Sequence, residues 1–216
     1  MKILCISAAN IEPARHTSAS VRACELIRSI IQDDLKLPHQ VEIMPLIEYR
    51  MQSCVMCGEC LSAGRCTRDE AFNHVFDAMQ RADAIFVVCP HYAPLPSKMM
   101  ILLEKLEEMA FLNFSTNRTY RSPFYGKPVG LVAHGGQTAE SLPYYKTALL
   151  DPLATAFASC SFKVVGTEEP WTNGVTFGIT SLTMPKDSIF CAISHDWEDV
   201  RNRLAPLVRN VTALLG

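Results

Sequence analysis

The sequence predicts an α/β fold in which helices cover both faces of a parallel β-sheet. Short apolar segments alternate along the chain with longer amphipathic segments, and this order is typical of right-handed βαβ units. One short segment, DAIFVVCP (83–90), is apolar at every residue after Asp83 rather than at every second residue. A strand buried on both faces has this pattern, which places the segment in the middle of a sheet covered on both sides.

Five strands and five helical segments follow from these patterns. The predicted strands are 2–7, 41–46, 83–90, 127–136 and 162–166. The predicted helices are 20–31, a segment that opens at Thr67, 97–109, most of 139–159, and a segment that begins near Asp196. Such a set fits a flavodoxin-like, doubly wound, five-stranded parallel sheet of order 2-1-3-4-5. Residues 167–195 are expected to form an excursion near the fifth strand.

Local signals set the expected helix ends. Thr67 and Glu70 have the spacing of a capping box, so a helix should begin at Thr67. Pro143 and Pro152 should interrupt the helical segment 139–159, and Pro206 should kink or end the last helix.

Composition limits the classes of partner. The chain of 216 residues is predicted to be one domain, 1–216, and its formal net charge of −2 gives no overall attraction to nucleic acid or to a membrane surface. The apolar run at the N-terminus ends at Ile6, too early for a signal peptide, and no segment approaches a membrane span. We therefore expect a cytoplasmic protein whose nine cysteines are thiols or metal ligands rather than disulfides.

Ligands of such a sheet bind beyond the carboxyl ends of its strands. After the first strand, Ser7, Thr17, Ser18 and Ser20 place hydroxyls in a loop that leads into a helix. Hydroxyls and free backbone amides at a helix N-terminus suit a phosphate monoester. Ordinary capping of the helix by one of these hydroxyls is the alternative.

Two further loops leave the same edge of the sheet. The loop CPHYAPLPS (89–97) is stiffened by prolines and presents His91 and Tyr92, so it could hold one edge of a planar heterocycle or simply turn into a helix. The loop after the fourth strand contains His134, Gly135 and Gly136, where glycine would allow the backbone to approach a ligand closely. Together the three loops indicate a binding site.

These segments resemble the NAD(P)H-dependent FMN reductase family of flavodoxin-like proteins, and most closely its iron–sulfur flavoprotein branch. The resemblance rests on KILCIS…HTSAS, on the cysteine segment SCVMCGECLSAGRCTRDE (53–70), and on DAIFVVCPHYAPLPSKMMILLEKL and KPVGLVAHGG. It implies FMN as cofactor, with Thr17, Ser18 and Ser20 at its phosphate. It also implies a flavin ring lined by Pro90, His91, Tyr92, Ala93, His134, Gly135 and Gly136. The family commonly continues this loop as Ser-Gly-Ser-Pro-Arg, whereas Ser7 precedes two alanines here, so Arg15 or His16 is expected to replace a missing hydroxyl.

Four cysteines lie within SCVMCGECLSAGRCTRDE (53–70). Cys54, Cys57, Cys60 and Cys66 have the spacing C-x2-C-x2-C-x5-C. Structural zinc sites usually separate two ligand pairs more widely, whereas successive x2 intervals are found in ferredoxins, and a disulfide pair fits least well. We therefore expect residues 48–67 to be a cysteine-rich loop after strand 2 that binds one 4Fe-4S cluster, as in the resembled branch. An empty thiol loop, or one that takes up zinc, is the alternative.

The predicted function is that of an FMN-dependent oxidoreductase that couples a flavin to a 4Fe-4S cluster. NAD(P)H is the expected donor, and a quinone, a ferredoxin or a similar redox protein is the expected partner. An NAD(P)H-dependent FMN or quinone reductase without a cluster is one alternative, and a flavodoxin-like electron carrier without enzymatic activity is another. No catalytic acid or base is assigned from the sequence. The resembled family leads us to expect a homodimer or homotetramer whose neighbouring subunits complete the flavin site.

Overall fold

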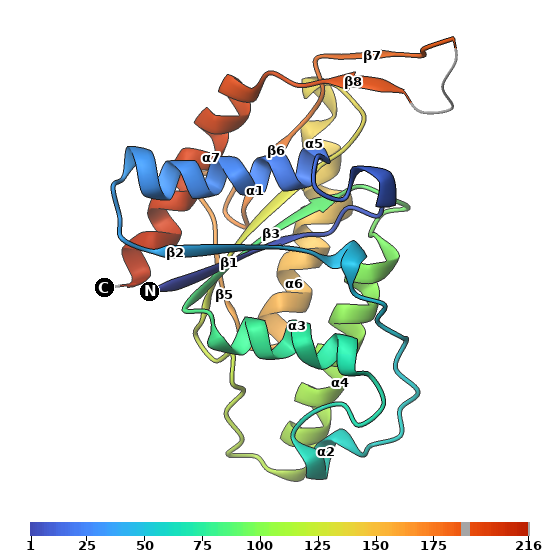
Figure 1. The fold of residues 1–216 in the computed structure, drawn as a ribbon. Helices are drawn as coiled ribbons and strands as arrows, with labels where there is room; N and C mark the ends of the chain where they lie inside the picture. The colour runs from blue at the N-terminus through green and yellow to red at the C-terminus, as the bar shows by residue number, and fades with distance from the viewer. Residues whose placement is uncertain (187–190, 216) are drawn as a thin grey trace.

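The computed structural model describes residues 1–186 and 191–215 and is built around a parallel sheet (Figure 1). The strands of this sheet are β1 (Lys2–Ser7), β2 (Gln40–Pro45), β3 (Ala84–Pro90), β4 (Pro128–His134), β5 (Lys163–Val165) and β6 (Val175–Phe177). Their order is β2-β1-β3-β4-β5, with β6 also paired to β4. The predicted flavodoxin-like order 2-1-3-4-5 is confirmed, and every predicted strand is present.

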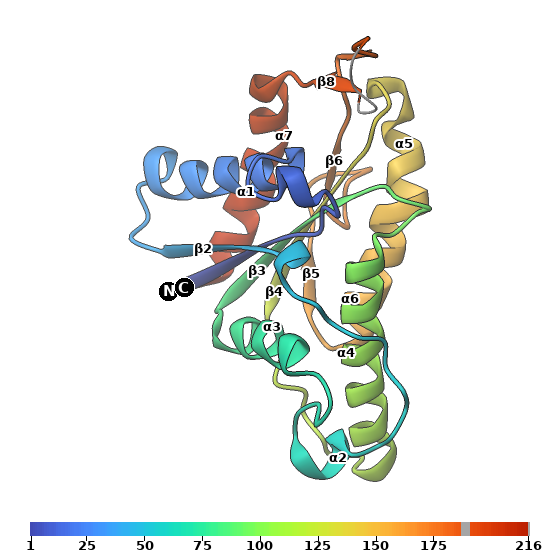
Figure 2. The ribbon, with the colours of Figure 1, turned by 45° about the vertical axis from the view of Figure 1, so that its right-hand side comes forward.

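Helices cover both faces of the sheet (Figure 2). They are α1 (Ala19–Ser29), α2 (Cys60–Ala63), α3 (Glu70–Arg81), α4 (Ser97–Thr116), α5 (Leu142–Tyr145), α6 (Asp151–Ser159) and α7 (Trp197–Thr212). Shorter 3-10 and π-helical segments are η1 (Glu12–Ala14), η2 (Ile30–Asp34), η3 (Leu46–Glu48), η4 (Ala139–Ser141), η5 (Lys146–Leu150) and η6 (Ala213–Leu215).

The alternation of side chains along each strand divides the core into two clusters. In β1, Ile3 and Cys5 join the cluster that packs against α1 and α7, whereas Leu4 and Ile6 join the one that packs against α3, α4 and α6. Because apolar residues are needed on both faces, β1 and β3 have continuous apolar runs.

The fifth position of the sheet is shared by two short strands. β5 pairs with the first half of β4, from Pro128 to Gly130, and β6 pairs with its second half, from Val132 to His134. The predicted excursion 167–195 therefore returns to the sheet. It then continues into β7 (Ser181–Thr183) and β8 (Ala192–Ser194), an antiparallel pair that projects from the carboxyl edge (Figure 1).

The predicted helix start at Thr67 is wrong, and of the kink or end predicted at Pro206, the end is absent. Helix α3 is capped by Asp69, whose carboxylate accepts a hydrogen bond from the Phe72 amide at 2.9 Å, while the Thr67 hydroxyl bonds to Glu59 instead. Helix α7 continues through Pro206 to Thr212, so this proline does not end it. The predicted interruption of 139–159 is confirmed, because a π-helical segment separates α5 from α6.

None of the helices in the described parts of the chain is both long enough and apolar enough to cross a membrane.

Candidate functional site

A cavity of about 630 Å³ lies at the carboxyl edge of the sheet, where β1, β3 and β4 end. The loops that follow these strands form most of its wall, and the segment from β8 to the start of α7 closes another side. Nine of the residues expected at the flavin line this cavity: Thr17, Ser18, Ser20, Pro90, His91, Tyr92, His134, Gly135 and Gly136. The fold thus brings the three predicted loops together.

The first loop presents the start of α1 to the cavity. Ser18 is the N-cap, and its hydroxyl accepts a hydrogen bond from the Val21 amide at 3.3 Å, as the capping alternative requires. The first amides of a helix have no partner within the helix, so those of Ala19 and Ser20 are suited to an anionic ligand. Ser20 is fully buried at this helix end.

A buried hydrogen bond joins the first loop to the end of β4. The Ser20 hydroxyl lies 2.7 Å from Nε2 of His134, whose ring stacks on Phe177 with centroids 4.6 Å apart. Burial lowers the pKa of His134 to about 3, and nearby His195 contributes to the shift. The imidazole is therefore neutral near pH 7, so it orients the Ser20 hydroxyl without adding charge.

The loop after β3 is fixed to the loop after β4. The His91 amide donates to the His134 carbonyl at 2.7 Å, and the Tyr92 amide donates to the Pro94 carbonyl at 2.7 Å. Nε2 of His91 also lies 3.1 Å from the Tyr144 hydroxyl. These bonds give the cavity a stiff wall of backbone and aromatic groups, which suits a planar ring.

Four predicted residues do not line the cavity. Ser7 is buried at the end of β1, and its hydroxyl has no hydrogen-bond partner among the residues that the structure describes. Arg15 and Ala93 are exposed. His16 lies 3.2 Å from Glu48 in an exposed pair. The cation expected to replace a missing hydroxyl is therefore not at the cavity in Arg15 or His16.

Arg22 is a cavity residue that the sequence prediction missed. Its guanidinium lies 4.2 Å from the centroid of the Trp197 ring, and both residues line the cavity. His195 stands beside them and donates from Nδ1 to the Gly178 carbonyl at 2.9 Å. The other residues that line the cavity and were not predicted are Ala9, Ile11, Ala14, Ala19, Ile179, Cys191, Ile193 and Ser194.

The cavity fits FMN by the chemistry of its wall. One end has a helix N-terminus, the buried Ser20 hydroxyl and the cation Arg22, which match a phosphate. The other has the fixed backbone of the His91 and Gly135 loops. At Gly136 a methyl group would meet no atom of the described residues within 4 Å, so this loop leaves open space.

A second cavity, of about 330 Å³, is lined by all four clustered cysteines, Cys54, Cys57, Cys60 and Cys66. It lies between the segment that carries them and α4, away from the β7–β8 end of the molecule (Figures 1 and 2). The segment turns at Gly58 and Gly64, whose φ angles of 72° and 69° lie in the left-handed region.

The four thiols are close enough to interact. Burial raises the pKa of the Cys60 thiol, and the neighbouring thiols Cys54, Cys57 and Cys66 raise it further. Cys66 is held most firmly, because its amide donates to Oδ1 of Asn73 at 3.0 Å and its carbonyl accepts from Nδ2 of Asn73 at 2.7 Å.

Residues 1–186 and 191–215 contain no group of three or more Cys, His, Asp or Glu side chains gathered closely enough for one metal ion. All four cysteines nevertheless line one cavity, and this donor set of thiols fits an iron–sulfur cluster in its chemistry.

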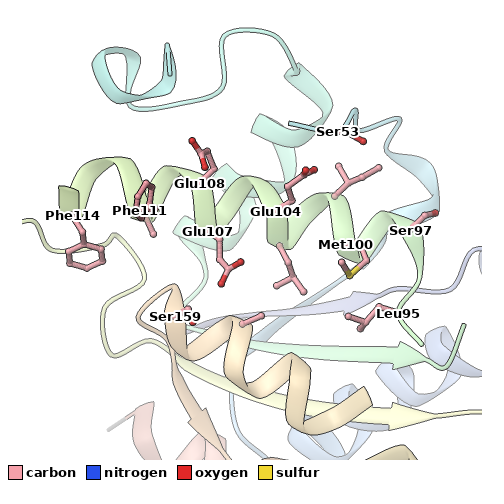
Figure 3. Close-up of a pocket in the computed structure, with 14 residues that line it drawn as sticks. Ser53, Leu95, Ser97, Met100, Glu104, Glu107, Glu108, Phe111, Phe114 and Ser159 are labelled. Carbon is pink, nitrogen blue, oxygen red and sulfur yellow. The ribbon is translucent and has the colours of Figure 1, made fainter. Parts of the chain in front are cut away.

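A long open groove of about 1140 Å³ follows the outer side of α4 (Figure 3). Met100, Phe111 and Phe114 expose apolar surface along it, interspersed with acidic residues such as Glu104 and Glu107. Ser53, just before the first cysteine, also lines the groove. The groove is therefore adjacent to the thiol cavity.

A parallel sheet of this order, with a cavity of this kind at its carboxyl edge, defines a flavodoxin-like protein. The chain matches the family model of NADPH-dependent FMN reductases over residues 1–145, and it belongs to this family. It is therefore an oxidoreductase, and FMN is the cofactor that membership supports.

Known proteins give a consistent picture. The chain is 36% identical to an iron–sulfur flavoprotein of Archaeoglobus fulgidus over 67 residues, which are 31% of this chain and about a third (33%) of that relative. An apo NADH:FMN oxidoreductase has a TM-score of 0.55 at 15% identity, over 100% of this chain and 90% of the other. A flavodoxin of Fusobacterium nucleatum bound to flavin mononucleotide has a TM-score of 0.52 at 15% identity, over 99% and 98%. The structural likenesses show the fold.

Proposed function

We propose that this oxidoreductase binds FMN at the carboxyl edge of the sheet and passes electrons between the flavin and a 4Fe-4S cluster held by Cys54, Cys57, Cys60 and Cys66. The observation that carries the proposal is the convergence of these four thiols on one cavity in a chain that also has a flavin-type cavity. The partial match to an iron–sulfur flavoprotein supports it.

Each part of the flavin cavity has its own task. The α1 N-terminus, Ser20 and Arg22 bind the phosphate, and neutral His134 orients the Ser20 hydroxyl toward it. The loops at His91 and Gly135 hold the ring. Bound FMN supplies the ability to exchange two electrons with a nicotinamide and single electrons with a one-electron carrier.

The cysteine segment 48–67 binds the cluster and keeps its distance from the flavin of the same chain. Lys105, at the thiol cavity, lies eight residues after Ser97, or about 12 Å along α4 from the loop that lines the flavin cavity. The resembled family, whose neighbouring subunits complete the flavin site, supports the proposal that the cluster exchanges electrons with the flavin of a neighbouring subunit. The apolar groove on α4 (Figure 3) is a suitable contact for that subunit in a homodimer or homotetramer.

The second candidate function is an NAD(P)H-dependent FMN or quinone reductase whose thiols hold no cluster. The finding that favours it is the lack of a close metal-binding group among the described residues. A flavodoxin-like carrier without enzymatic activity is less well supported, because the family is one of enzymes. NAD(P)H oxidation with a quinone or with ferredoxin as acceptor distinguishes these functions.

The test is anaerobic purification from iron-replete cells, followed by flavin, iron and acid-labile sulfide assays. We expect FMN, not FAD, together with about four iron and four sulfide per chain, the composition of one 4Fe-4S cluster. Cys60→Ala should lose iron and sulfide but keep FMN, whereas Cys24→Ala, which removes a buried thiol elsewhere, should keep both. Wild-type protein with FMN but without sulfide would refute the cluster and leave the simpler reductase.

A further inference from the structure

Lys105 is a buried cation at the wall of the thiol cavity. Its side chain is 5% exposed, and its ammonium lies 3.0 Å from Oδ2 of Asp69 and 3.6 Å from Sγ of Cys66. It also lies 5.3 Å from the centroid of the Phe72 ring. The ammonium is thus placed between one carboxylate and one thiol.

Asp69 keeps two hydrogen bonds that do not involve Lys105. Asp69 accepts hydrogen bonds from the amides of Gln52, at 2.8 Å, and Phe72, at 2.9 Å. These bonds cap α3 and attach the start of the cysteine segment, while Lys105 supplies the countercharge of the buried carboxylate. A buried lysine is costly because it loses water and side-chain freedom, and a well-packed apolar residue often replaces such an ion pair without loss of stability. We therefore expect the buried ammonium to have a role other than packing.

We propose that Lys105 raises the reduction potential of the group held by the four cysteines, through a charge-assisted hydrogen bond to Sγ of Cys66. This inference rests on the proposed function. Reduction adds one electron to the cluster, taken from reduced flavin or, in an experiment, from dithionite. No bond to Cys66 forms or breaks and no proton moves. The cluster becomes more negative, and hydrogen bonds and positive charge at its sulfurs stabilise that state.

The sign of the effect follows from the contacts of the ammonium. The Lys105 ammonium contacts the sulfur of Cys66 directly, and it also forms an ion pair with Asp69. Because the ammonium is in direct contact with the sulfur, the pair favours the reduced cluster even though Asp69 offsets part of the field. Asn73 fixes the backbone of Cys66, so the thiol is held within reach of the ammonium.

The test is an anaerobic redox titration with dithionite and mediators, followed by electron paramagnetic resonance of the reduced cluster. Lys105→Met should disfavour reduction at least tenfold, which lowers the midpoint potential by at least 59 mV for one electron. Lys105→Arg keeps the charge and should restore most of the wild-type potential. The matched control is Lys98→Met, which removes a cation two turns earlier on α4 that binds the Tyr49 carbonyl and no thiol. It should change the equilibrium less than threefold.

Lys105→Met leaves Asp69 buried without its cation, which could prevent folding. A second variant therefore tests the proposal without leaving this unpaired charge. Lys105→Met with Asp69→Asn removes both charges, keeps a capping side chain and should still lower the potential, by less than the single change. An unchanged potential in either variant, with iron and sulfide contents equal to wild type, would overturn the role of Lys105. Wild-type protein without sulfide would instead overturn the proposed function, and with it this inference.

Discussion

Gly135→Ala is expected to destabilise the protein by crowding a fully buried tyrosine. A Cβ added at Gly135 would lie 2.4 Å from the Tyr145 hydroxyl oxygen and 2.5 Å from its Cζ, inside the 3.0 Å that real Cβ contacts essentially never cross. The ring cannot withdraw freely, because Tyr145 is 1% exposed and lies against His91. Its hydroxyl also accepts the Gln137 amide at 2.9 Å, a bond that withdrawal would break.

The magnitude follows from these two effects. Overpacking costs about 1–3 kcal/mol, and the lost hydrogen bond adds about 1 kcal/mol, which gives a decrease of about 2–4 kcal/mol in the free energy of unfolding. For a chain of this length the melting temperature should fall by about 4–16 °C. Urea unfolding followed by circular dichroism, with thermal melts, measures both.

Gly136→Ala is the matched control for this prediction. Nothing lies within 4 Å of a Cβ at Gly136, so the same substitution one residue later should change stability by no more than about 0.5 kcal/mol. In a Tyr145→Phe background, where the hydroxyl and its bond are already gone, the cost of Gly135→Ala should shrink. Equal stability of Gly135→Ala and Gly136→Ala would refute the assigned contact between Gly135 and Tyr145.

The remaining predictions concern one histidine, one cation and one helix cap. The pKa of His134 is about 3 in the folded protein and near 6.5 in the unfolded chain, so only the unfolded chain takes up a proton between these values. The free energy of unfolding is therefore highest above pH 6.5 and decreases as the pH falls toward 3, by about 2 kcal/mol between pH 6.5 and 5. Urea unfolding measured against pH should show a shallower dependence in His134→Gln. Arg22→Gln should weaken FMN binding to apoprotein about tenfold in fluorescence titrations, about 1.4 kcal/mol, while Arg15→Gln changes it little; a larger loss in Arg15→Gln would reverse the assignment. Asp196→Ala should cost about 1 kcal/mol in urea unfolding, because its carboxylate caps α7, and an unchanged midpoint would contradict that role.

Strand order and the three loops at the sheet edge were predictable because they depend on local patterns. The continuous apolar run of β3 placed it in the middle of the sheet, and the loops after β1, β3 and β4 had to meet at its carboxyl edge. The strand β6 escaped prediction because three residues, Val175–Phe177, carry too little pattern to mark a strand. Its pairing with β4 depends on a return of the chain that no local signal announces.

The residues missed at the two cavities share one physical reason. Arg22 lies on a helix that its periodicity predicted, but it gains its place at the cavity from Trp197 on a distant helix, and nothing near Arg22 in the sequence indicates that contact. Lys105 likewise is buried because the cysteine segment folds over α4.

The helix cap shows the same limit. Thr67 and Asp69 are both good N-cap residues, and the sequence near them does not choose between them. The choice is made by the Gln52 amide and the Lys105 ammonium, which both bind Asp69 from elsewhere in the chain.

The β7–β8 pair gives the cavity at the carboxyl edge of the sheet a wall of low intrinsic stability. Its strands have three residues each, all exposed, and an isolated two-stranded ribbon is marginally stable in water. Ile193 and Ser194 line the cavity, so a ligand that contacts them only when β7 and β8 are paired would stabilise the paired conformation. By linkage, the pairing strengthens ligand binding by the same free energy. With FMN in this cavity, as proposed above, the stability of the ribbon bears on whether FMN remains on the protein through many turnovers or exchanges with the surrounding pool.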